Sequence, residues 1–247
     1  MPLIVERRER VAIVTLSDPE RRNALTLPLV DEIVATFDAL EADGDVGAVV
    51  ITGDGRAFCS GADVSALATM ASDTADDDER RGVAAVYEGF LRVLHSTLPT
   101  VAAINGPAVG AGFNLALACD VRIVGESARL DARFLQIGLH PGGGHLWLLE
   151  RAVGPQTAAA ITLFGQALDG RTAAARGLAW SCHPDDELVD AAVTLASGAA
   201  AVPKPLMART KQTLRAAPWQ PDFATAVRTE LTHQTWSFTQ GWFPPSR

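Results

Sequence analysis

The stretch from residue 100 to residue 124, TVAAINGPAVGAGFNLALACDVRIV, constrains the fold of this chain most. It predicts a buried strand over 100–104, a tight turn over 105–109, a helix from Gly110-Ala111-Gly112 to Ala118, and a second strand over 121–124. Small residues at a strand-to-helix turn let a ligand approach the backbone closely. The unpaired N–H groups of the helix start can then bind a phosphate, a carboxylate or an oxyanion.

An earlier segment has a similar design. Residues 48–52 (AVVIT) predict an apolar strand, Gly53-Asp54-Gly55 predicts a turn, and residues 57–63 (AFCSGAD) lead towards a helix. Small residues alone often mark only close helix–strand packing. Two such units, however, can aim two N–H donors at a single oxygen atom.

Length and composition indicate one globular protein. A chain of 247 residues with 48% hydrophobic residues can bury one substantial core. The net charge of −8, from 21 basic and 29 acidic residues, argues against a nucleic-acid partner. The three cysteines are far apart in sequence, which favours reduced thiols in the cytoplasm. We expect no signal peptide, no membrane-spanning segment and no membrane partner.

Local patterns predict several further elements. Residues 3–6 and 11–16 predict a hairpin, and Thr26 predicts the N-cap of a helix. Residues 69–81 predict a mobile loop or a frayed helix start, followed by an amphipathic helix over 82–97. The acidic run 76–79 could be imagined as a metal site, but consecutive acids do not converge on one point, so we predict no metal site. Three helices are expected over 187–201, 203–217 and 222–239.

Four sequence motifs together indicate a family resemblance. They are PERRNAL at 19–25, AFCSGAD at 57–63, INGPAVGAG at 104–112 and IGLHPGGG at 137–144. In this order and spacing they resemble the crotonase superfamily, the enoyl-CoA hydratase/isomerase proteins, over roughly residues 1–215. The resemblance implies an α/β fold, a spiral of repeated ββα units over 1–190 with a C-terminal helical oligomerisation region over 191–247.

The same resemblance implies the ligand, an acyl-CoA thioester, with coenzyme A as part of the substrate and no separate cofactor. It implies that the backbone N–H groups of Ala62 and Ala111 stabilise the thioester enolate. By resemblance, the substrate-binding residues are Arg22, Ala24, Ser60, Gly61, Asp63, Val64, Tyr87, Gly110, Phe134 and Gly142.

The chain departs from the hydratases of the family at both expected glutamates. Those positions hold Asn114, which can orient a water but cannot take a proton, and Phe134, which can do neither. His140 is a candidate acid/base because an unperturbed imidazole titrates near ~6.5. Asp131 is a second candidate, although it can also simply pair with Arg129 or Arg133. His140 and His145 can equally be loop or helix-cap residues.

The reaction therefore stays open. The first hypothesis is an enoyl-CoA hydratase/isomerase-type enzyme with an unusual acid/base set. The alternatives are a decarboxylase or thioester hydrolase, and a catalytically silent acyl-CoA-binding protein. The resemblance also implies a homotrimer or a dimer of trimers. The tail lacks the C-terminal lysine that often meets a CoA phosphate in the family, and its aromatic residues Trp236, Trp242 and Phe243 fit either a subunit interface or packing on their own core.

Overall fold

The computed structural model describes residues 2–62 and 77–242 of the chain. Its main sheet has six strands in the order β1-β2-β3-β4-β6-β9. These are β1 (Leu3–Arg8), β2 (Val11–Leu16), β3 (Ala48–Gly53), β4 (Thr100–Ile104), β6 (Val121–Gly125) and β9 (Ser181–His183). Strand β1 forms the predicted hairpin with β2, and the other neighbours are parallel. The predicted α/β class is confirmed.

A second, small sheet lies beside the first. It contains β5 (Pro107–Val109), β7 (Arg129–Asp131) and β8 (Leu168–Asp169). Strand β5 is parallel to β7, and Cys59 bridges to Ala108 on the other side of β5. The interpretation of residues 105–109 as a tight turn is therefore wrong for 107–109. Such a short strand containing proline forms only because two distant segments supply its hydrogen bonds.

The helices named above from the sequence lie close to their expected positions, and α5 and α6 are additional. They are α1 (Leu27–Ala42), α3 (Asp77–Leu94), α4 (Ala111–Ala118), α5 (His145–Thr162), α6 (Gly170–Ala175), α7 (Leu188–Ala200), α8 (Lys204–Ala216) and α9 (Phe223–Phe238), with short 3-10 turns η1 (Pro19–Arg21), η2 (Leu135–Ile137) and η3 (Ala217–Trp219). Thr26 is the N-cap of α1, and its Oγ1 accepts a hydrogen bond from the Leu29 N–H. Helix α3 begins five residues before its predicted start. The part of the expected mobile segment at 69–76 lies outside the described residues. In residues 2–62 and 77–242, no helix combines the length and the apolarity needed to cross a bilayer.

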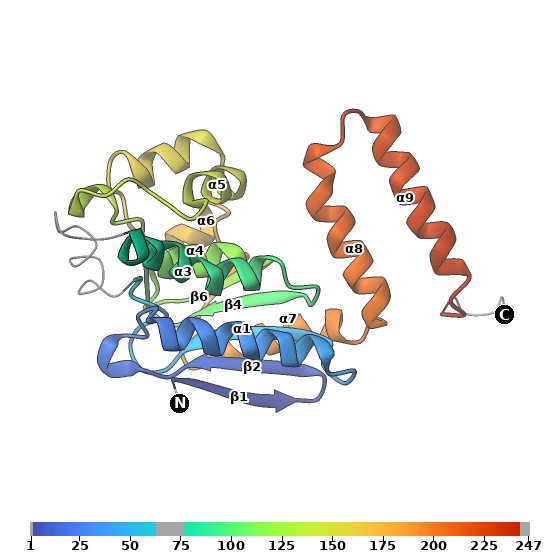
Figure 1. Cartoon of the computed structure of the whole chain (residues 1–247), viewed down its shortest axis with the longest axis horizontal. Coiled ribbons are helices and arrows are strands. Elements are labelled where there is room, and N and C mark those ends of the chain that lie inside the picture. The colour runs from blue at the N-terminus through green and yellow to red at the C-terminus, as the bar shows by residue number, and fades with distance from the viewer. Residues whose placement is uncertain (1, 63–76, 243–247) are drawn as a thin grey trace.

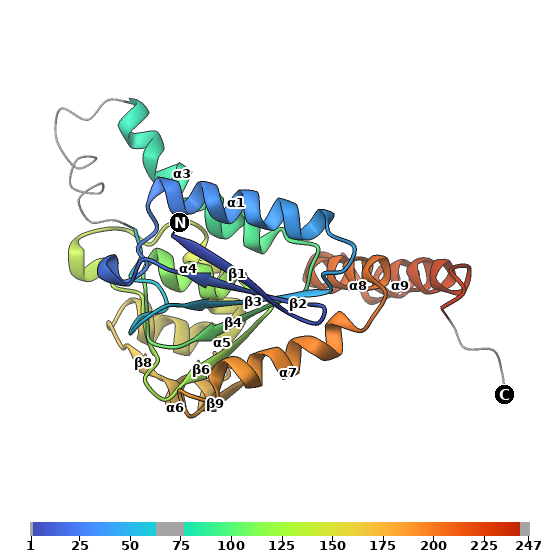
Figure 2. The same ribbon diagram turned by 90° about the horizontal axis from the view of Figure 1, so that it is seen from below.

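Successive side chains of a strand point to opposite faces of the main sheet, so apolar residues form a core on each face. Ala12 and Val14 of β2 belong to the core that includes α1, whereas Val11 and Ile13 belong to the core that includes α7. Figure 2 shows α1 and α7 on opposite sides of the sheet. Helix α7 faces the sheet with small residues, and a Cβ on Gly47 would lie 2.5 Å from the Ala200 carbonyl oxygen. This close approach makes a three-layer body.

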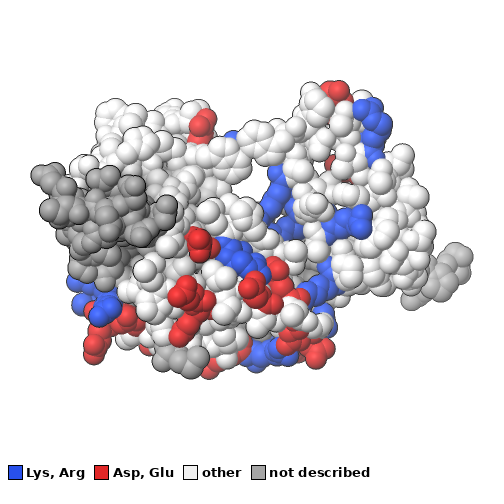
Figure 3. All heavy atoms as spheres, viewed as in Figure 1, with Lys and Arg blue, Asp and Glu red and all other residues white. Residues whose placement is uncertain are grey.

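Helices α8 and α9 form a pair that stands beside this body (Figure 1), and we call it the arm. In the space-filling view the arm shows mainly uncharged surface, and a hollow separates much of it from the body (Figure 3). The predicted boundary after residue 190 falls inside α7, which packs on the sheet. The division of the chain into 1–190 and 191–247 stays a prediction.

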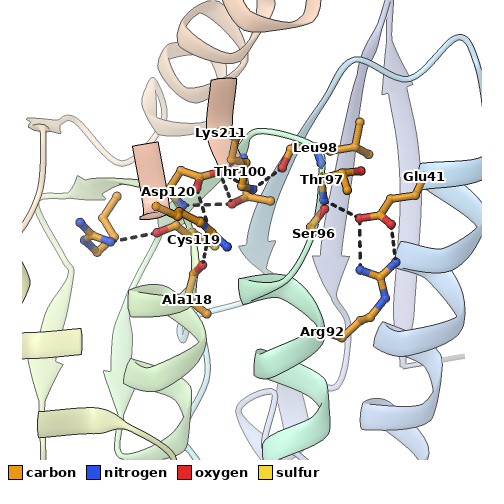
Figure 4. A network of polar contacts seen from close by, with 12 residues as sticks. Glu41, Arg92, Ser96, Thr97, Leu98, Thr100, Ala118, Cys119, Asp120 and Lys211 are labelled. Atoms are coloured by element: carbon orange, nitrogen blue, oxygen red, sulfur yellow. Dashed lines mark hydrogen bonds and ion pairs between the residues drawn. The ribbon is translucent and has the colours of Figure 1, made fainter. Parts of the chain in front are cut away.

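Several contacts hold the arm to the body. Asp120, which follows α4, accepts hydrogen bonds from Lys211 and Arg215 of α8, each over 2.7 Å. Figure 4 shows Lys211 and Asp120 within a polar network that also includes Thr100 and Leu98. Just beyond the C-terminal end of α8, the indole rings of Trp147 and Trp219 stack with their centroids 5.6 Å apart. At the N-terminal end of α8, the Lys204 Nζ donates to the carbonyl oxygens of Glu41 and Asp43, each over 2.7 Å. The arm is thereby fixed at both ends of α8.

Candidate active site

The two strand–turn–helix units predicted from the sequence lie side by side. The Cys59 N–H donates to the Pro107 carbonyl oxygen over 3.2 Å, and the Val109 N–H donates to the Cys59 carbonyl oxygen over 3.0 Å. Gly112 permits this approach, because a Cβ there would lie 2.1 Å from the Cys59 carbonyl oxygen. A Cβ on Gly61 would lie 3.5 Å from the Ala111 nitrogen. The segments that carry Ala62 and Ala111 are therefore neighbours.

Both alanines have a backbone N–H that is not engaged. Neither N–H donates to an acceptor within the described part of the chain. Ala111 is the first residue of α4, so its N–H has no acceptor in the helix. The preceding N–H, on Gly110, is by contrast bound to the Asp131 carbonyl oxygen over 3.0 Å. Two free donors close together can stabilise a negatively charged oxygen.

The loop before α1 packs against the first of these units. The Ser60 N–H donates to the Arg22 carbonyl oxygen over 3.0 Å, and the Leu25 N–H donates to the Gly61 carbonyl oxygen over 2.8 Å. Ala24 is buried in this contact, while the Arg22 side chain is exposed. Arg22, Ala24, Ser60 and Gly61 are thus brought together, next to Ala62. The predicted contacts Asp63 and Val64 lie outside the described residues.

Asn23 holds this loop in place, although it was not among the residues predicted for the site. The residue has a φ of 56°, a left-handed conformation that asparagine tolerates better than most residues. Its buried Nδ2 donates to the carbonyl oxygens of Ala57 and Asp54, over 2.8 and 3.0 Å. Its position within the motif PERRNAL is the one sequence signal that could have indicated this role.

A second group of predicted residues gathers around the glycine loop before α5. Asn114 is buried, and its Nδ2 donates to the Gly142 carbonyl oxygen over 2.9 Å. The Tyr87 hydroxyl group from α3 lies against Gly142, since a Cβ on that glycine would be 2.2 Å from the Tyr87 Oη. Tyr87, Asn114 and Gly142 therefore form one wall, built from α3, α4 and the loop.

His145, at the start of α5, joins this wall to Phe134. Its Nδ1 lies 2.7 Å from the Asn114 Oδ1, and its ring meets Phe113 and Phe134 edge-on with centroids 5.3 and 5.1 Å apart. Burial lowers the pKa of the His145 imidazole to about 4. From the sequence, His145 could equally be a loop or helix-cap residue. Its contact with Asn114, 31 residues earlier in the chain, could not be inferred from local patterns.

Phe134 also lies against the turn that carries the free Ala111 N–H. We call this turn and the one that carries the Ala62 N–H the donor turns. Two atoms of its ring edge lie 3.9 Å from where a Cβ on Gly110 would be. The ring is half-buried and packs on the main core. Phe134 therefore lies between His145 and the turn that carries Ala111.

The two acid/base candidates from the sequence lie in different surroundings. The buried Asp131 carboxylate accepts from the Arg133 Nη2 over 2.8 Å and from the Arg133 N–H over 3.0 Å, so of the two predicted partners it pairs with Arg133. His140 is exposed, with its Nδ1 2.7 Å from the Pro141 carbonyl oxygen. Neither side chain bonds to Asn114 or His145. Their catalytic roles stay predictions.

In residues 2–62 and 77–242, no group of three or more His, Cys, Asp or Glu side chains is arranged to hold a metal ion. A groove of about 400 Å³ lies between α8 and α9, lined by residues such as Leu206, Thr213 and His233. It is remote from the donor turns, and none of the predicted site residues lines it.

Comparison with known proteins gives consistent matches. Residues 6–240 match the family described as enoyl-CoA hydratase/isomerase. The chain is 48% identical over 215 residues to the probable enoyl-CoA hydratase EchA14 of Mycobacterium tuberculosis, covering 87% of this chain and 82% of the relative. It is 35% identical over 213 residues to the 2,3-dehydroadipyl-CoA hydratase of Escherichia coli, covering 86% and 81%.

Solved structures match equally well. The enoyl-CoA hydratase from Bacillus anthracis superposes with a TM-score of 0.90 at 26% identity, covering 98% of this chain and 92% of that one. A Thermobifida fusca protein described as an enoyl-CoA hydratase, in complex with acetoacetyl-CoA, gives a TM-score of 0.86 at 32% identity, covering 97% and 95%.

Proposed function

Because the chain belongs to the enoyl-CoA hydratase/isomerase family, we propose that it binds an acyl-CoA thioester and catalyses a reaction at the carbon next to the thioester. Coenzyme A enters as part of the substrate, and no separate cofactor is needed. The complex of the related Thermobifida fusca protein with acetoacetyl-CoA supports this ligand class.

The observation that carries the proposal is the pair of free N–H groups on Ala62 and Ala111. Addition to an enoyl thioester, or removal of a proton beside it, places negative charge on the thioester oxygen. Two fixed donors stabilise that enolate, and loss of one such donor typically raises the barrier by roughly 3–4 kcal/mol. The thioester oxygen sits between the two N–H groups in this proposal.

Surrounding residues give the substrate its position. Arg22 and Ala24 face the CoA nucleotide, and Ser60, Gly61 and Gly110 line the approach to the thioester. Tyr87, Phe134 and Gly142 border the acyl chain. The packing of these residues around the two donor turns, in two groups, supports this assignment. Asp63 and Val64 are kept as substrate contacts on the family resemblance alone.

A two-glutamate hydration is not available to this chain. The Asn114 amide is occupied by Gly142 and His145, and Phe134 has no group that can carry a proton. His140 and Asp131 remain the acid/base candidates drawn from the sequence. If they serve, His140→Ala and Asp131→Asn each slow turnover at least about tenfold, with little change in acyl-CoA affinity. Unchanged turnover in both variants excludes these two residues.

The donor role is tested at Ala111 with a matched pair of substitutions. Ala111→Pro removes the N–H, and proline is well tolerated at the first position of a helix. Ala111→Gly keeps the N–H. The readout is conversion of whichever thioester the natural chain turns over, a 2-enoyl-CoA in H₂¹⁸O or a 3-enoyl-CoA, followed by mass spectrometry or absorbance. Turnover should fall by about 10²–10³-fold in the proline variant only. Equal rates in the two variants would contradict the role of Ala111.

The absence of both family glutamates also favours a second candidate, a catalytically silent protein that binds acyl-CoA. Calorimetric titration with saturated and unsaturated acyl-CoAs separates the two. Binding without turnover of 2-enoyl, 3-enoyl or malonyl-type thioesters would select the silent protein over an enzyme, including the decarboxylase and hydrolase alternatives. No binding of any acyl-CoA would remove both candidates.

We also propose that the arm packs against further copies of the chain, as a homotrimer or a dimer of trimers. Large apolar side chains on it are well exposed in the single chain, with Phe223 at 84%, Leu214 at 71% and Leu231 at 58%. Such a surface is typical of a subunit interface. Sedimentation equilibrium should give a trimer or hexamer for the natural chain and a smaller species for Phe223→Asp. A monomeric natural chain would rule this assembly out.

A further inference from the structure

The hydrogen bonds around His145 assign its tautomer. Asn114 donates from Nδ2 to the Gly142 carbonyl oxygen, so the Asn114 atom facing His145 is the acceptor Oδ1. An acceptor oxygen 2.7 Å from the His145 Nδ1 requires a hydrogen on that nitrogen. The other ring nitrogen, Nε2, then carries a lone pair and no hydrogen while the ring is neutral.

This Nε2 is buried and has no hydrogen-bond partner within the described residues. His145 as a whole is 1% exposed. Leaving a buried acceptor unsatisfied typically costs about 1–3 kcal/mol, and such atoms are rare in folded proteins. An unsatisfied buried acceptor in a folded protein calls for an explanation, and a catalytic role is one such explanation.

The position of His145 relative to the donor turn is well defined. Asn114, which holds its ring, lies three residues after Ala111 on α4, and residues three apart share a helix face. Phe134 touches the His145 ring and also lies against the position of Gly110. His145 is therefore linked to the turn that carries the Ala111 N–H through two residues that it contacts, Asn114 and Phe134.

We propose that His145 Nε2 carries the proton in this active site and that the substrate is a 3-enoyl-CoA thioester, whose double bond the enzyme shifts to the 2-position. The proposal rests on the function proposed above, since it needs the thioester oxygen to be bound by Ala62 and Ala111.

The step balances with one base. The C2–H bond breaks, the proton goes to Nε2, and the electron pair of that bond moves to form the enolate at the thioester oxygen. The enolate then returns its electrons through C2 and C3, the C3=C4 double bond opens, and C4 takes the proton from Nε2. No water, oxidant or second base is consumed.

The surroundings of the ring favour this isomerisation over hydration. Phe113 and Phe134 meet the imidazole edge-on, and Asn114 is the only polar side chain among its described contacts. Hydration requires a water molecule between the base and C3, and two phenyl rings make a poor site for one. A direct transfer between carbon and nitrogen needs no such water.

The ring environment also sets a suitable basicity. Desolvation lowers the pKa of His145 to about 4, and no charged side chain among the described residues contributes to the shift. An ordinary glutamate titrates at about 4.3, so the buried imidazole matches a carboxylate in base strength. It is neutral at pH 7 and ready to accept a proton.

The test uses the purified full chain with 3-hexenoyl-CoA, and follows formation of the 2-enoyl thioester by absorbance. His145→Gln should lower kcat by about a hundredfold or more, while calorimetric affinity for butyryl-CoA changes less than about threefold. The matched control is His95→Gln, an exposed histidine just after α3, which should keep the natural rate. Circular dichroism shows whether each variant is folded.

The outcomes separate the two proposals. If the natural chain binds no butyryl-CoA, the proposed function fails and this inference with it. Binding and isomerisation by the natural chain, with His145→Gln within about threefold of its rate, overturns only the role of His145. Binding with hydration of crotonyl-CoA but no isomerisation overturns the substrate class. Binding without any turnover overturns proton transfer and leaves acyl-CoA binding intact.

A second measurement needs no substitution at His145. In ¹⁵N-histidine-labelled natural chain, the imidazole shifts of His145 should report a hydrogen on Nδ1 and none on Nε2 at pH 7. Addition of acetoacetyl-CoA should move the Nε2 resonance. The proposal is overturned if the opposite tautomer is found, or if the chemical shift of Nε2 does not change at saturating acetoacetyl-CoA. This holds even if His145→Gln does not fold.

Discussion

Asp120 and Lys211 form an ion pair, with Oδ2 and Nζ 2.7 Å apart, between the end of α4 and the arm. The Lys211 side chain is 7% exposed, so the pair lies largely out of water. The Thr100 N–H and hydroxyl group donate to the same Asp120 oxygen over 2.9 and 3.0 Å, and Arg215 donates to the other oxygen (Figure 4). One carboxylate therefore joins β4, α4 and α8.

Asp120→Asn should destabilise the protein strongly. The change leaves the Lys211 ammonium buried without its counter-charge, and breaking a buried pair in this way typically costs about 3–5 kcal/mol. The control is Asp190→Asn, which removes the exposed partner of Arg8. That change should cost about 1 kcal/mol or less. Urea unfolding of the two variants provides the comparison, and equal losses would contradict the structural role of Asp120.

Asp120 should also make the stability of the protein sensitive to acid. Burial alone would raise the pKa of its carboxyl group, but Lys211, Arg215 and the Thr100 hydrogen bonds outweigh burial and hold that pKa below its ordinary value of 3.8. A pKa lowered in the folded state stabilises the protein above the unfolded-state value, and this stability is lost as pH falls through the folded-state value. Burial lowers the pKa of Lys211 as well, yet its ammonium is fully charged in acid.

The Tm of the natural chain should therefore fall more steeply than that of Asp120→Asn as the pH is lowered from about 5 towards 3. Differential scanning calorimetry of both proteins across this range measures the difference. Parallel pH profiles would show that Asp120 does not titrate with a lowered pKa.

Two glycine-to-alanine substitutions in helices should have opposite effects. In Gly112→Ala the new Cβ would meet the Cys59 carbonyl oxygen at 2.1 Å, so the two donor turns must move apart. The expected cost is about 1–3 kcal/mol or more, together with weaker acyl-CoA binding. In Gly198→Ala of α7 the Cβ meets nothing within 4 Å. That variant should gain about 0.4–1 kcal/mol. Thermal unfolding and calorimetric titration test both, and a stabilised Gly112→Ala would refute the close approach.

The three thiols should differ in reactivity. Burial raises the pKa of Cys59 and of Cys119 to about 12, whereas Cys182 is only half-buried. Because the thiolate is the reactive form, iodoacetamide at pH 8 should modify Cys182 first and leave the other two unmodified in the folded protein. Peptide mass spectrometry after labelling in buffer and in urea distinguishes them. Early labelling of Cys59 would show that the turn before Ala62 opens in solution.

Local sequence patterns were enough for several of the helices and for several strands of the main sheet. Thr26 was identified as an N-cap because a hydroxyl group just before Leu27-Pro28 can accept a hydrogen bond from the first turn of a helix. Gly154-Pro155 interrupts α5 as the sequence Gly-Pro favours, but the helix resumes after one non-helical residue, Gly154. By contrast, Pro107–Val109 depends on β7 and Cys59 for its strand conformation, and no local pattern encodes partners so far away.

The residues of the candidate site could be predicted only where they lie within family motifs. The motifs around Gly61-Ala62 and Gly110-Ala111 indicated two donor turns, and the structure brings these turns together. His145 could not be found in this way. The role proposed for His145 depends on its contacts with Asn114 and Phe134, which come from other elements. It also depends on the burial of Nε2, which arises only when the chain is packed.

Helix α4 places Ala111 and Asp120 near its two ends. All eight residues of this helix are buried, and it is about 12 Å long. A fully buried helix cannot bend independently of its neighbours, so it behaves as a short rigid rod. The donor N–H at one end and the anchor of the arm at the other are thus mechanically coupled. A displacement of α8 that is transmitted through Asp120 would therefore reach the Ala111 N–H, so the arm and the turn that begins α4 should not move independently.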